Sequence, residues 1–489
     1  MTSSSTDEYD VIVIGGGPVG ENAAQYAIQG SDRTAVIVEH ELVGGECSYW
    51  ACMPSKALLL PGSVLNQARS MPGVREIVGD SPLDVDAVLA RRDTYTHDLD
   101  DSSQVEWAEG AGMDVVRGHG RLSGEKEVTV GDRVLRARHA VIVATGTTAT
   151  VPPVPGLREA LPWTSRDATN LHEVPERIVV VGGGVVACES ATWLLSLGAE
   201  VTMVVRGKSL LAGSEPFAGS AVADALTAAG ARIMFESEAS NVSRPDARDT
   251  GYGRIHGGPI SVTVGDDTLE VDEILVAAGR RPATKDLGLD ADLGLAGPTA
   301  GEKKGLTPGE SITVDDHLTA AGEWLYAVGD VNGRALLTHM GKYQGRVCGD
   351  VIAARADGKP LDDSRFRASA DHGQVPQVVF TTPEVASVGL TAKQARAAGT
   401  PVNVVEMDIA VAGSSLRQDD FAGRASMVVD TSKNVIVGFT LVGQGVSELL
   451  HAATIAVVGA VPLDTLWHAV PSYPTMSEVW LRLLESARG

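Results

Sequence analysis

The chain has few cysteines, a deficit of basic residues and no long apolar run. Only four of its 489 residues are cysteine, which excludes a scaffold held together by several disulfides, as in small secreted domains. Acidic residues outnumber basic ones by 63 to 40, for a net charge of −23. A surface this acidic argues against nucleic acid or an anionic membrane as a partner.

The missing apolar runs and targeting signals bear on where the protein works. No stretch reaches the roughly 18 apolar residues of a transmembrane helix, and residues 1–8 lack the pattern of a signal peptide. We therefore expect a cytoplasmic protein without a membrane partner. The short run Ile455–Val461 predicts a core helix, and the chain length predicts more than one domain.

Two of the four cysteines, Cys47 and Cys52, lie five positions apart. Without signs of export, such a pair is more often catalytic or metal-binding than structural. Zinc sites usually space their cysteines more closely and need two further ligands, and no local His or third Cys is present, so we expect no metal. The pair favours a redox disulfide that works by thiol–disulfide exchange. Two unpaired buried cysteines are the alternative.

A dinucleotide-binding pattern precedes the cysteine pair. Residues 10–14 predict a strand, and a glycine-rich turn and a helix pattern follow. Gly15 permits the tight turn, Gly17 lets the backbone approach a pyrophosphate, and Gly20 lets the helix pack on the strand. The next predicted strand ends at Glu39, where a carboxylate can accept hydrogen bonds from ribose hydroxyls.

The same pattern occurs a second time. A strand predicted at Arg177–Val181 leads into a turn with Gly182, Gly184 and Ala187 at the three critical positions. A helix and another strand follow. Two such units predict two bound nucleotides, and a redox pair beside the first unit predicts electron flow between them.

The two units end on opposite charges. Gly15 precedes Glu39 by 24 residues, and Gly182 precedes Arg206 by the same 24, with Lys208 two positions on. A basic residue at this point suits the 2′-phosphate of NADP, which a carboxylate would repel. The alternative is that both cations lie on a solvated strand end.

At this point the chain resembles the flavoprotein disulfide reductases of the pyridine nucleotide–disulphide oxidoreductase family, among them dihydrolipoamide dehydrogenase, glutathione reductase and mercuric reductase. The resemblance covers nearly the whole length. Besides the two glycine turns, the motifs that carry it are 47–56, Ala144-Thr145-Gly146, Gly279-Arg280-Arg281-Pro282, Leu325–Asp330, Val379–Glu384 and Tyr473–Glu478.

The resemblance implies an α/β fold with two Rossmann-like domains, for FAD and NAD(P), and a C-terminal α+β domain that forms a homodimer. The segments expected are 1–160 for the first part of the FAD-binding domain, 161–286 for the NAD(P)-binding domain, 287–367 for the return segment of the FAD-binding domain, and 368–489 for the dimerisation domain. Residues 297–309, rich in glycine, predict a surface loop within the return segment.

The resemblance also assigns roles. Cys52 would lie nearest the flavin, Cys47 would attack the substrate, and Lys56 near the flavin would pair with Glu189. Asp330 would hold the ribityl chain. The preference for NADPH over NADH is expected from Arg206 and Lys208 rather than from the resemblance. The cofactor-binding residues expected are Gly15, Gly17, Gly20, Glu39, Gly45, Lys56, Thr145, Gly146, Gly182, Gly184, Ala187, Arg206, Lys208, Gly279 and Asp330. The other two cysteines, Cys188 and Cys348, are expected to be packed as small apolar residues.

The chain departs from the family pattern near its C-terminus. Most of these reductases have a general-base histidine where this chain has Tyr473, and that histidine is held by the glutamate that corresponds to Glu478. A phenol titrates near pH 10 and is a poor base at neutral pH. His468 is an alternative base, although a histidine without function is the simpler interpretation. Glutathione disulfide and lipoamide are therefore doubtful substrates.

Several functions remain open on the sequence alone. The leading hypothesis is an FAD-dependent NADPH oxidoreductase that uses Cys47 and Cys52 to reduce a small disulfide or another acceptor. Direct reduction of a quinone or dye by the flavin is the second. A mercuric-reductase-like activity shares Tyr473, but the chain ends without that enzyme's cysteine pair and begins without its metal-binding extension. A redox-sensing flavoprotein without useful turnover is the alternative outside enzymes.

Overall fold

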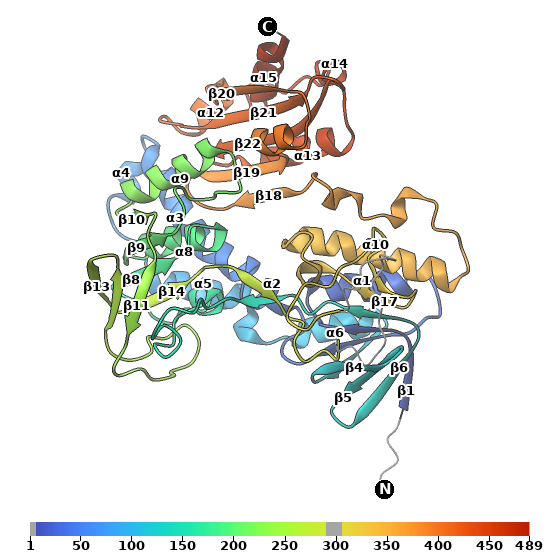
Figure 1. Cartoon of the computed structure of the whole chain (residues 1–489). Coiled ribbons are helices and arrows are strands. Elements are labelled where there is room, and N and C mark those ends of the chain that lie inside the picture. The colour runs from blue at the N-terminus through green and yellow to red at the C-terminus, as the bar shows by residue number, and fades with distance from the viewer. Residues whose placement is uncertain (1–5, 290–305, 489) are drawn as a thin grey trace. The chain divides into compact units, whose positions relative to one another are not determined.

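The computed structural model describes residues 6–289 and 306–488, which form two compact units (Figure 1). The glycine-rich loop predicted at 297–309 lies mostly outside these residues. Each unit is assembled from three stretches of chain. Unit 1 contains residues 1–53, 93–149 and 280–371, and unit 2 contains residues 54–92, 150–279 and 372–489. The division of the chain into the four predicted domain segments stays a prediction.

Unit 1 is built on a mainly parallel sheet with the strand order β16-β17-β6-β1-β2-β3, to which the hairpin of β4 and β5 is added beside β6. The strands are β1 (Thr6–Ile14), β2 (Ala35–Glu39), β3 (Met113–Arg117), β4 (Gly120–Gly124), β5 (Glu127–Val130), β6 (Arg133–Val143), β16 (Thr319–Ala321) and β17 (Leu325–Ala327), with β7 (Thr147–Ala149) and β15 (Arg280–Pro282) paired separately. The helices are α1 (Pro18–Ile28), α2 (Gly45–Tyr49), α6 (Ser102–Gly110) and α10 (Thr338–Ala356).

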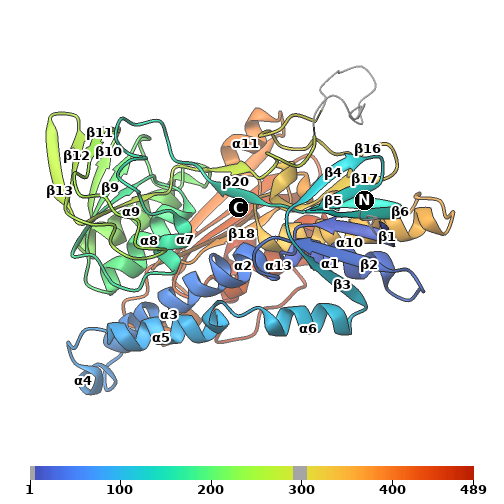
Figure 2. The same ribbon diagram turned by 90° about the horizontal axis from the view of Figure 1, so that it is seen from below.

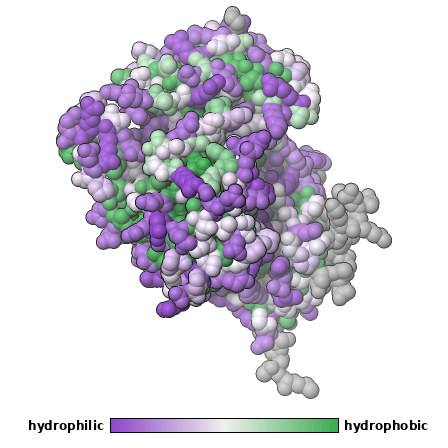
Figure 3. Space-filling view, turned by 60° about the vertical axis from the view of Figure 1, so that its left-hand side comes forward, coloured by the Kyte–Doolittle hydropathy of each residue, from purple (hydrophilic) through white to green (hydrophobic). Residues whose placement is uncertain are grey.

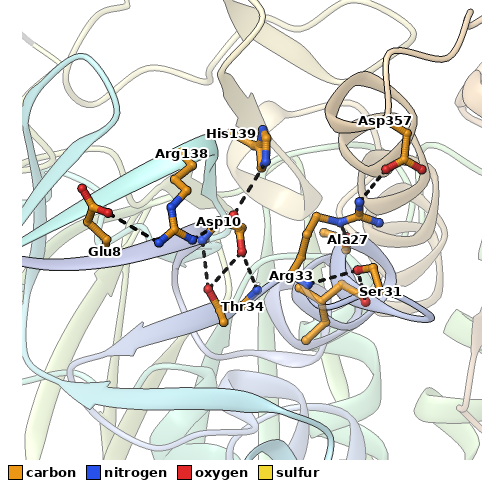
Figure 4. A network of polar contacts seen from close by, with 10 residues as sticks. Glu8, Asp10, Ala27, Ser31, Arg33, Thr34, Arg138, His139 and Asp357 are labelled. Carbon is orange, nitrogen blue, oxygen red and sulfur yellow. Dashed lines mark hydrogen bonds and ion pairs between the residues drawn. The ribbon is translucent and has the colours of Figure 1, made fainter.

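A buried aspartate fixes the strand that leads into the first glycine turn. Asp10 lies at an irregularity in the pairing of β1 with β6. Figure 4 shows it between Thr34, Arg138 and His139. The Thr34 backbone N–H donates to Asp10 Oδ2 at 2.8 Å, and Arg138 Nη1 donates to Oδ1 at 3.2 Å. Burial opposes ionisation, but these hydrogen bonds hold the pKa of Asp10 below its ordinary value.

Glycines on α10 bring this helix unusually close to α1. A Cβ added to Gly345 would lie 2.8 Å from the Val19 carbonyl oxygen, and one added to Gly349 would lie 2.5 Å from the Tyr26 Cβ. Any larger residue at these two positions of α10 would therefore push the helices apart. Cys348, on the same helix, is fully buried, as predicted.

Unit 2 contains a four-stranded parallel sheet with the order β10-β9-β8-β14 and a separate antiparallel sheet of β11, β12 and β13. The strands are β8 (Arg177–Val181), β9 (Glu200–Val205), β10 (Arg232–Phe235), β14 (Glu273–Val276), β11 (Ala239–Ser243), β12 (Ile260–Val264) and β13 (Asp267–Val271). The helices in this part of the unit are α3 (Cys52–Ser70, entering from unit 1), α4 (Arg75–Val78), α5 (Val85–Tyr95), α7 (Ser165–Thr169), α8 (Val185–Ser196) and α9 (Pro216–Ala228). Helices α3 and α5 lie side by side (Figure 2), joined where Arg91 Nη1 donates to the Ala57 carbonyl oxygen at 2.8 Å.

The C-terminal part of unit 2 is an antiparallel sheet with the order β18-β19-β22-β21-β20. Its elements are β18 (Pro376–Val379), β19 (Glu384–Gly389), α11 (Ala392–Ala397), β20 (Val402–Asp408), α12 (Ala412–Arg417), β21 (Arg424–Asp430), β22 (Val435–Gly443), α13 (Leu450–Val458), α14 (Leu463–Leu466) and α15 (Glu478–Arg488). The prediction of a core helix at Ile455–Val461 was partly wrong. The helix there is α13, which ends at Val458, and Ile455 is 58% exposed because only one face of α13 packs on the sheet.

The surface of the molecule is mainly hydrophilic on the face that Figure 3 draws. Hydrophilic residues cover most of the face drawn in Figure 3, with apolar residues in smaller patches between them. Within residues 6–289 and 306–488, no helix is both long and apolar enough to cross a membrane.

Candidate functional site

The first glycine turn has the backbone that its sequence predicts. Gly15 has a φ of +109°, and a Cβ at this position would collide with the Ala144 carbonyl oxygen. Gly20 is equally crowded, because its Cβ would meet the Gly15 carbonyl oxygen. Gly17, in contrast, has open space beside it, and the nearest heavy atom to an added Cβ is the Gly45 Cα at 3.9 Å. The turn is therefore closed toward the protein and open at the N-terminus of α1, where a pyrophosphate would bind.

Glu39, at the end of β2, is buried beside this turn. Its Oε2 accepts from the Gly16 backbone N–H at 2.7 Å, and its Oε1 accepts from the Glu41 backbone N–H at 2.7 Å. Burial opposes ionisation, but hydrogen bonds from His40 and these two N–H groups keep the pKa of Glu39 below its ordinary value. The carboxylate is thus held charged and in one orientation, as binding a ribose requires.

A polar network completes the unit 1 site. Thr147 Oγ1 donates to Asp330 Oδ2 at 2.9 Å, and Arg280 Nε donates to Thr147 Oγ1 at 2.7 Å. Arg280 also pairs with Glu46 at 3.2 Å. Burial raises the pKa of Asp330. The network joins the start of α2 to the segment that follows β17. Of its four residues, only Asp330 had been expected to bind the cofactor, and Arg280 had been noted only as part of a family motif.

The segment around Thr145 and Gly146 also belongs to unit 1. Thr145 Oγ1 donates to the Ala283 carbonyl oxygen at 2.8 Å, and the Ala283 backbone N–H donates to the Gly146 carbonyl oxygen at 3.0 Å. Gly45, the other glycine expected near the cofactor, has a φ of +55° and begins α2 two residues before the first cysteine.

The cysteine pair lies in unit 1. Cys47 lies on α2, Cys52 begins α3, and a hydrogen bond joins the two sulfurs. This bond and burial raise the pKa of Cys47, whereas Thr338 and Lys342 lower it. The Thr338 hydroxyl lies 3.3 Å from Cys52 Sγ. The first turn of α10 therefore contacts the dithiol directly, an arrangement that no sequence motif had indicated.

Lys56 and Glu189 form an ion pair in unit 2. Lys56 Nζ lies 3.0 Å from Glu189 Oε2 and 4.7 Å from the centre of the Phe380 ring. Glu189 Oε1 accepts from the Phe380 backbone N–H at 2.9 Å. Lys56 follows Cys52 by four residues on α3, so its cationic group is held one helical turn beyond the redox pair.

The second glycine turn repeats the geometry of the first. Gly182 has a φ of +134°, and a Cβ there would collide with the Ala277 carbonyl oxygen. An added Cβ at Gly184 would have no heavy atom within 4 Å, and Ala187 is buried against the core. The sequence repeat therefore corresponds to a repeat in backbone structure, with open space at the N-terminus of α8.

The basic residues of the second unit extend outward. The side chains of Arg206 and Lys208 are 86% and 85% exposed. Arg206 Nε lies 3.7 Å from Glu238 Oε1, and Lys208 Nζ lies 3.6 Å from Glu236 Oε1. Such exposed pairs contribute little and can be exchanged for a phosphate. Gly279, with a φ of +121°, is also unobstructed.

The site residues predicted near the C-terminus are Tyr473 and Glu478, with His468 as an alternative base. Tyr473 is 76% exposed, and its hydroxyl has no hydrogen-bond partner among the described residues. Glu478 is buried and pairs through Oε1 with Arg482 at 2.7 Å, while its Oε2 has no partner in that part of the chain. Within the described chain, the structure does not bring Tyr473 and Glu478 into hydrogen-bonding contact. His468 is exposed.

Cys188 and a metal site were the remaining candidates for chemistry. Cys188, on α8, is fully buried, and burial raises its pKa to about 12, as expected for a packed thiol. Among residues 6–289 and 306–488, no three His, Cys, Asp or Glu side chains gather as a metal site would require.

The geometry defines a class of protein. Two glycine turns that are open at helix N-termini, with a dithiol beside the first, belong to an oxidoreductase that binds two nucleotides. The family model for pyridine nucleotide-disulphide oxidoreductase matches residues 9–345, and the model for the dimerisation domain of the same family matches residues 375–483. The chain belongs to this family of enzymes.

Curated relatives span the length of the chain. It is 30% identical over 479 residues to a dihydrolipoyl dehydrogenase of Chlamydia muridarum, covering 97% of this chain and 96% of the relative. It is 32% identical over 498 residues to dihydrolipoyl dehydrogenase 2 of Haloarcula marismortui, covering 98% and 97%. A mercuric reductase of Staphylococcus aureus is 28% identical over 96% of this chain and 81% of its own.

A solved structure shows the same fold. The flavoprotein disulfide reductase RclA of Escherichia coli, in a Cu(II) complex, superposes with a TM-score of 0.79 at 22% identity, covering 98% of this chain and 99% of the other. Together, these comparisons establish the predicted α/β fold and a family whose members use FAD and a pyridine nucleotide. The open space at Gly17 and the oriented carboxylate of Glu39 fit FAD at the first turn.

Proposed function

We propose that the protein is a cytoplasmic NADPH oxidoreductase that passes electrons through the Cys47–Cys52 pair to a small disulfide or another acceptor. The observation that carries this proposal is the dithiol itself. The two sulfurs share a hydrogen bond on the unit that has the FAD-type turn, and Cys52 contacts Thr338. A purely structural pair would have no need of both cysteines so close to a nucleotide site.

The residues of unit 1 would bind FAD in the proposed enzyme. Gly15, Gly17 and Gly20 would surround the pyrophosphate, Glu39 would accept from the ribose, and Asp330 would hold the ribityl chain. When bound, FAD supplies the two-electron chemistry that connects a nicotinamide to a disulfide. The overall change balances as NADPH, one proton and one disulfide giving NADP⁺ and two thiols.

The cysteines have separate roles in the proposal. Cys47 attacks a sulfur of the substrate disulfide, forming a mixed disulfide and releasing the first thiol. Cys52 then attacks the Cys47 sulfur, which releases the second thiol and restores the intramolecular disulfide. Lys56, held by Glu189, keeps a positive charge on the helix that begins at Cys52 and favours its thiolate.

Replacing Cys47 tests the proposal. Cys47→Ser should retain FAD and NADPH-dependent reduction of a quinone dye, but lose disulfide reduction by at least a hundredfold, because serine cannot form the mixed disulfide. In the NADPH-reduced protein, Cys52→Ser should remove the long-wavelength absorbance that a thiolate beside the flavin produces. Disulfide turnover that survives in Cys47→Ser would contradict the proposal.

Direct reduction of quinones or dyes is the second candidate, and the exposed Tyr473 favours it. A phenol in the position of the family's imidazole supplies no base at neutral pH, and base catalysis typically contributes roughly a hundredfold to ten-thousandfold. We expect slow turnover of lipoamide and glutathione disulfide, and Tyr473→His should accelerate it while quinone reduction changes little. Wild-type rates of about 10–1,000 per second on either disulfide would contradict this expectation.

We further propose a homodimer in which Cys47 of one subunit works with Tyr473 and Glu478 of the other. The family's dimerisation domain and the exposure of Val470 (84%) and Tyr473 (76%) support this proposal, because side chains like these are commonly covered by a partner. Light scattering should give a dimer, and an active monomer would contradict the shared site.

A further inference from the structure

A bulge in β6 turns two consecutive basic side chains toward one carboxylate. In the pairing of β6 with β1, Arg138 and His139 lie opposite the single residue Asp10. Arg138 Nη1 lies 3.2 Å and His139 Nε2 lies 3.7 Å from the same oxygen, Asp10 Oδ1 (Figure 4). In a regular strand, neighbouring side chains would point to opposite faces of the sheet. Bulges re-aim side chains in this way and are common beside functional sites.

Both side chains line a pocket of about 510 Å³ in unit 1, which we call the bulge pocket. The rest of its wall comes from segments that are far apart in the sequence. It includes Lys126 at the tip of the β4–β5 hairpin, Glu323 and Trp324 in the turn between β16 and β17, and Arg355 in the last turn of α10. The volume is in the range of small-molecule sites. None of the residues assigned above to FAD, NADPH or the dithiol lines this pocket.

The bulge pocket is separate from the dithiol. Helix α10 begins at Thr338, which contacts Cys52, and Arg355 lies near its other end. At about 1.5 Å per residue, the helix holds these two positions roughly 25 Å apart. A molecule in the bulge pocket would therefore be a ligand in addition to the nucleotides and the substrate of the proposed enzyme.

Arg355 has one edge of its guanidinium without a partner. Its Nη1 donates to the Tyr326 hydroxyl at 2.5 Å and to Thr319 Oγ1 at 3.2 Å. Within the described residues, its Nε and Nη2 donate to no group. These two nitrogens carry neighbouring N–H groups that point the same way, which is the arrangement that binds both oxygens of a carboxylate. Because Nη1 is anchored, the side chain is already oriented for this contact.

A carboxylate lies close to this cation. The Tyr326 hydroxyl, which accepts from Arg355, donates to the Glu323 backbone carbonyl oxygen at 3.0 Å, so a single hydroxyl group links the two residues. The Glu323 side chain is exposed and forms no ion pair in the part of the chain that the structure describes. The same is true of Glu125 and Lys126, which lie side by side at the hairpin tip. The bulge pocket thus contains unpaired charges of both signs.

The unpaired charges of the bulge pocket are two cations and two carboxylates, because Arg138 is already paired with Asp10. A dianion such as phosphate would be attracted by the cations but repelled by the carboxylates. A molecule with one charge of each sign would find a partner for both. We propose that the bulge pocket binds a small zwitterion, an amino acid or a short peptide, with its carboxylate on Arg355 and its ammonium group beside Glu323. The proposal does not depend on the disulfide chemistry proposed above.

Isothermal titration calorimetry of the FAD-containing protein tests the proposal. NADP⁺ is present at saturation, so that the cations beside the second glycine turn are occupied. The probes are L-alanine and glycylglycine, and the controls are propionate, which has only the carboxylate, and propylamine, which has only the ammonium group. We expect at least one zwitterion to bind roughly tenfold more tightly than either control.

The same titrations identify the source of the zwitterion. Tighter binding of L-alanine indicates a free amino acid, and tighter binding of glycylglycine indicates a peptide. Propionate that binds as tightly as both zwitterions would contradict the proposal, and so would the absence of binding by every probe.

Arg355→Met should weaken binding of the zwitterion by roughly tenfold, because the two free N–H groups are lost. Arg355→Lys should lose part of the affinity, since an ammonium group keeps the charge without the paired N–H groups. Arg365→Met is the matched control. It removes an arginine that pairs with Asp350 on the same helix but does not line the pocket, so binding should change by less than twofold.

Glu323→Gln separates the contact with the ammonium group from damage to the fold. This exposed substitution should weaken binding of the zwitterion by roughly tenfold and leave binding of propionate unchanged, because propionate has no ammonium group. If Arg355→Met fails to fold, Glu323→Gln and Arg355→Lys still decide. Binding of the zwitterion with wild-type affinity by Glu323→Gln, or by a folded Arg355→Met, contradicts the proposal.

Discussion

The two glycine turns have nearly the same backbone conformation, but the nucleotide-binding patterns that they begin end in residues of opposite charge. Gly15 and Gly182 both have positive φ angles and both lie against a carbonyl oxygen of a neighbouring strand end. The pattern that begins at Gly15 ends in Glu39, which is buried and fixed by two backbone N–H groups. The pattern that begins at Gly182 ends in Arg206, which is 86% exposed.

In the proposed enzyme, this difference would affect how long each nucleotide stays bound. A carboxylate that is already dehydrated and oriented suits a cofactor that remains bound, because the cost of ordering it was met when the chain folded. Exposed, weakly paired cations suit a ligand that enters and leaves at each turnover. In the proposed enzyme, the same supersecondary unit would therefore retain one ligand in one half of the chain and exchange another in the other half.

The largest expected effect comes from closing the first turn. Gly15→Ala places a Cβ against the Ala144 carbonyl oxygen at a φ of +109°, so we expect purified protein with almost no FAD and a lowered Tm. Gly17→Ala separates folding from binding, because its nearest heavy atom lies 3.9 Å away and the turn can still form, so Tm should be kept even though the new Cβ would crowd the pyrophosphate. Thermal unfolding and the ratio of flavin to protein absorbance measure the two effects, and an equal loss of Tm in both variants would contradict the distinction.

Arg206→Glu places a carboxylate at the end of the second nucleotide-binding pattern, where the first has Glu39. We expect kcat/KM for NADPH to fall about tenfold to a hundredfold, which corresponds to roughly 1–3 kcal/mol for a charged contact with phosphate. The value for NADH should change by less than threefold, since NADH has no 2′-phosphate. Wild-type protein that uses both nucleotides equally would show that Arg206 is only a solvated strand end.

Glu39→Gln removes the charge of the carboxylate that ends the first nucleotide-binding pattern. Losing the charge that two N–H groups stabilise should cost about 1–2 kcal/mol, or about tenfold in FAD affinity. The pKa of Glu39 is lower in the folded protein, so its contribution to stability is present above the unfolded value near 4.3 and is lost as the pH falls through the folded value. Thermal unfolding between pH 3 and 6 should therefore be less pH-dependent in Glu39→Gln.

Lys208→Gln should have the smallest effect. The side chain is 85% exposed and lies 3.6 Å from Glu236, so its removal should lower kcat/KM for NADPH by only about twofold to threefold. Raising the ionic strength should reduce this difference further, because exposed charges are screened. A loss as large as that of Arg206→Glu would mean that the two cations are equivalent.

The repeated turns could be predicted from sequence because glycine is the residue that a positive φ and a close carbonyl oxygen require. The buried positions of Cys188 and Cys348 followed from their short apolar side chains. The contacts of Thr338 and Arg280 could not be predicted, because they depend on which segments meet after residues far apart in sequence fold together.

The close packing of α1 and α10 has a consequence for how the chain can vary. Gly341, Gly345 and Gly349 recur every four residues on α10 and face Val19, Asn22 and Tyr26 with no room for another carbon atom. The two helices therefore behave as one incompressible body, and the nucleotide turn and the Thr338 hydroxyl that contacts Cys52 both lie at the end where these helices begin. A bulkier residue on either helix would have to be matched by a smaller one opposite, so these two stretches should accept substitutions in pairs and resist them singly.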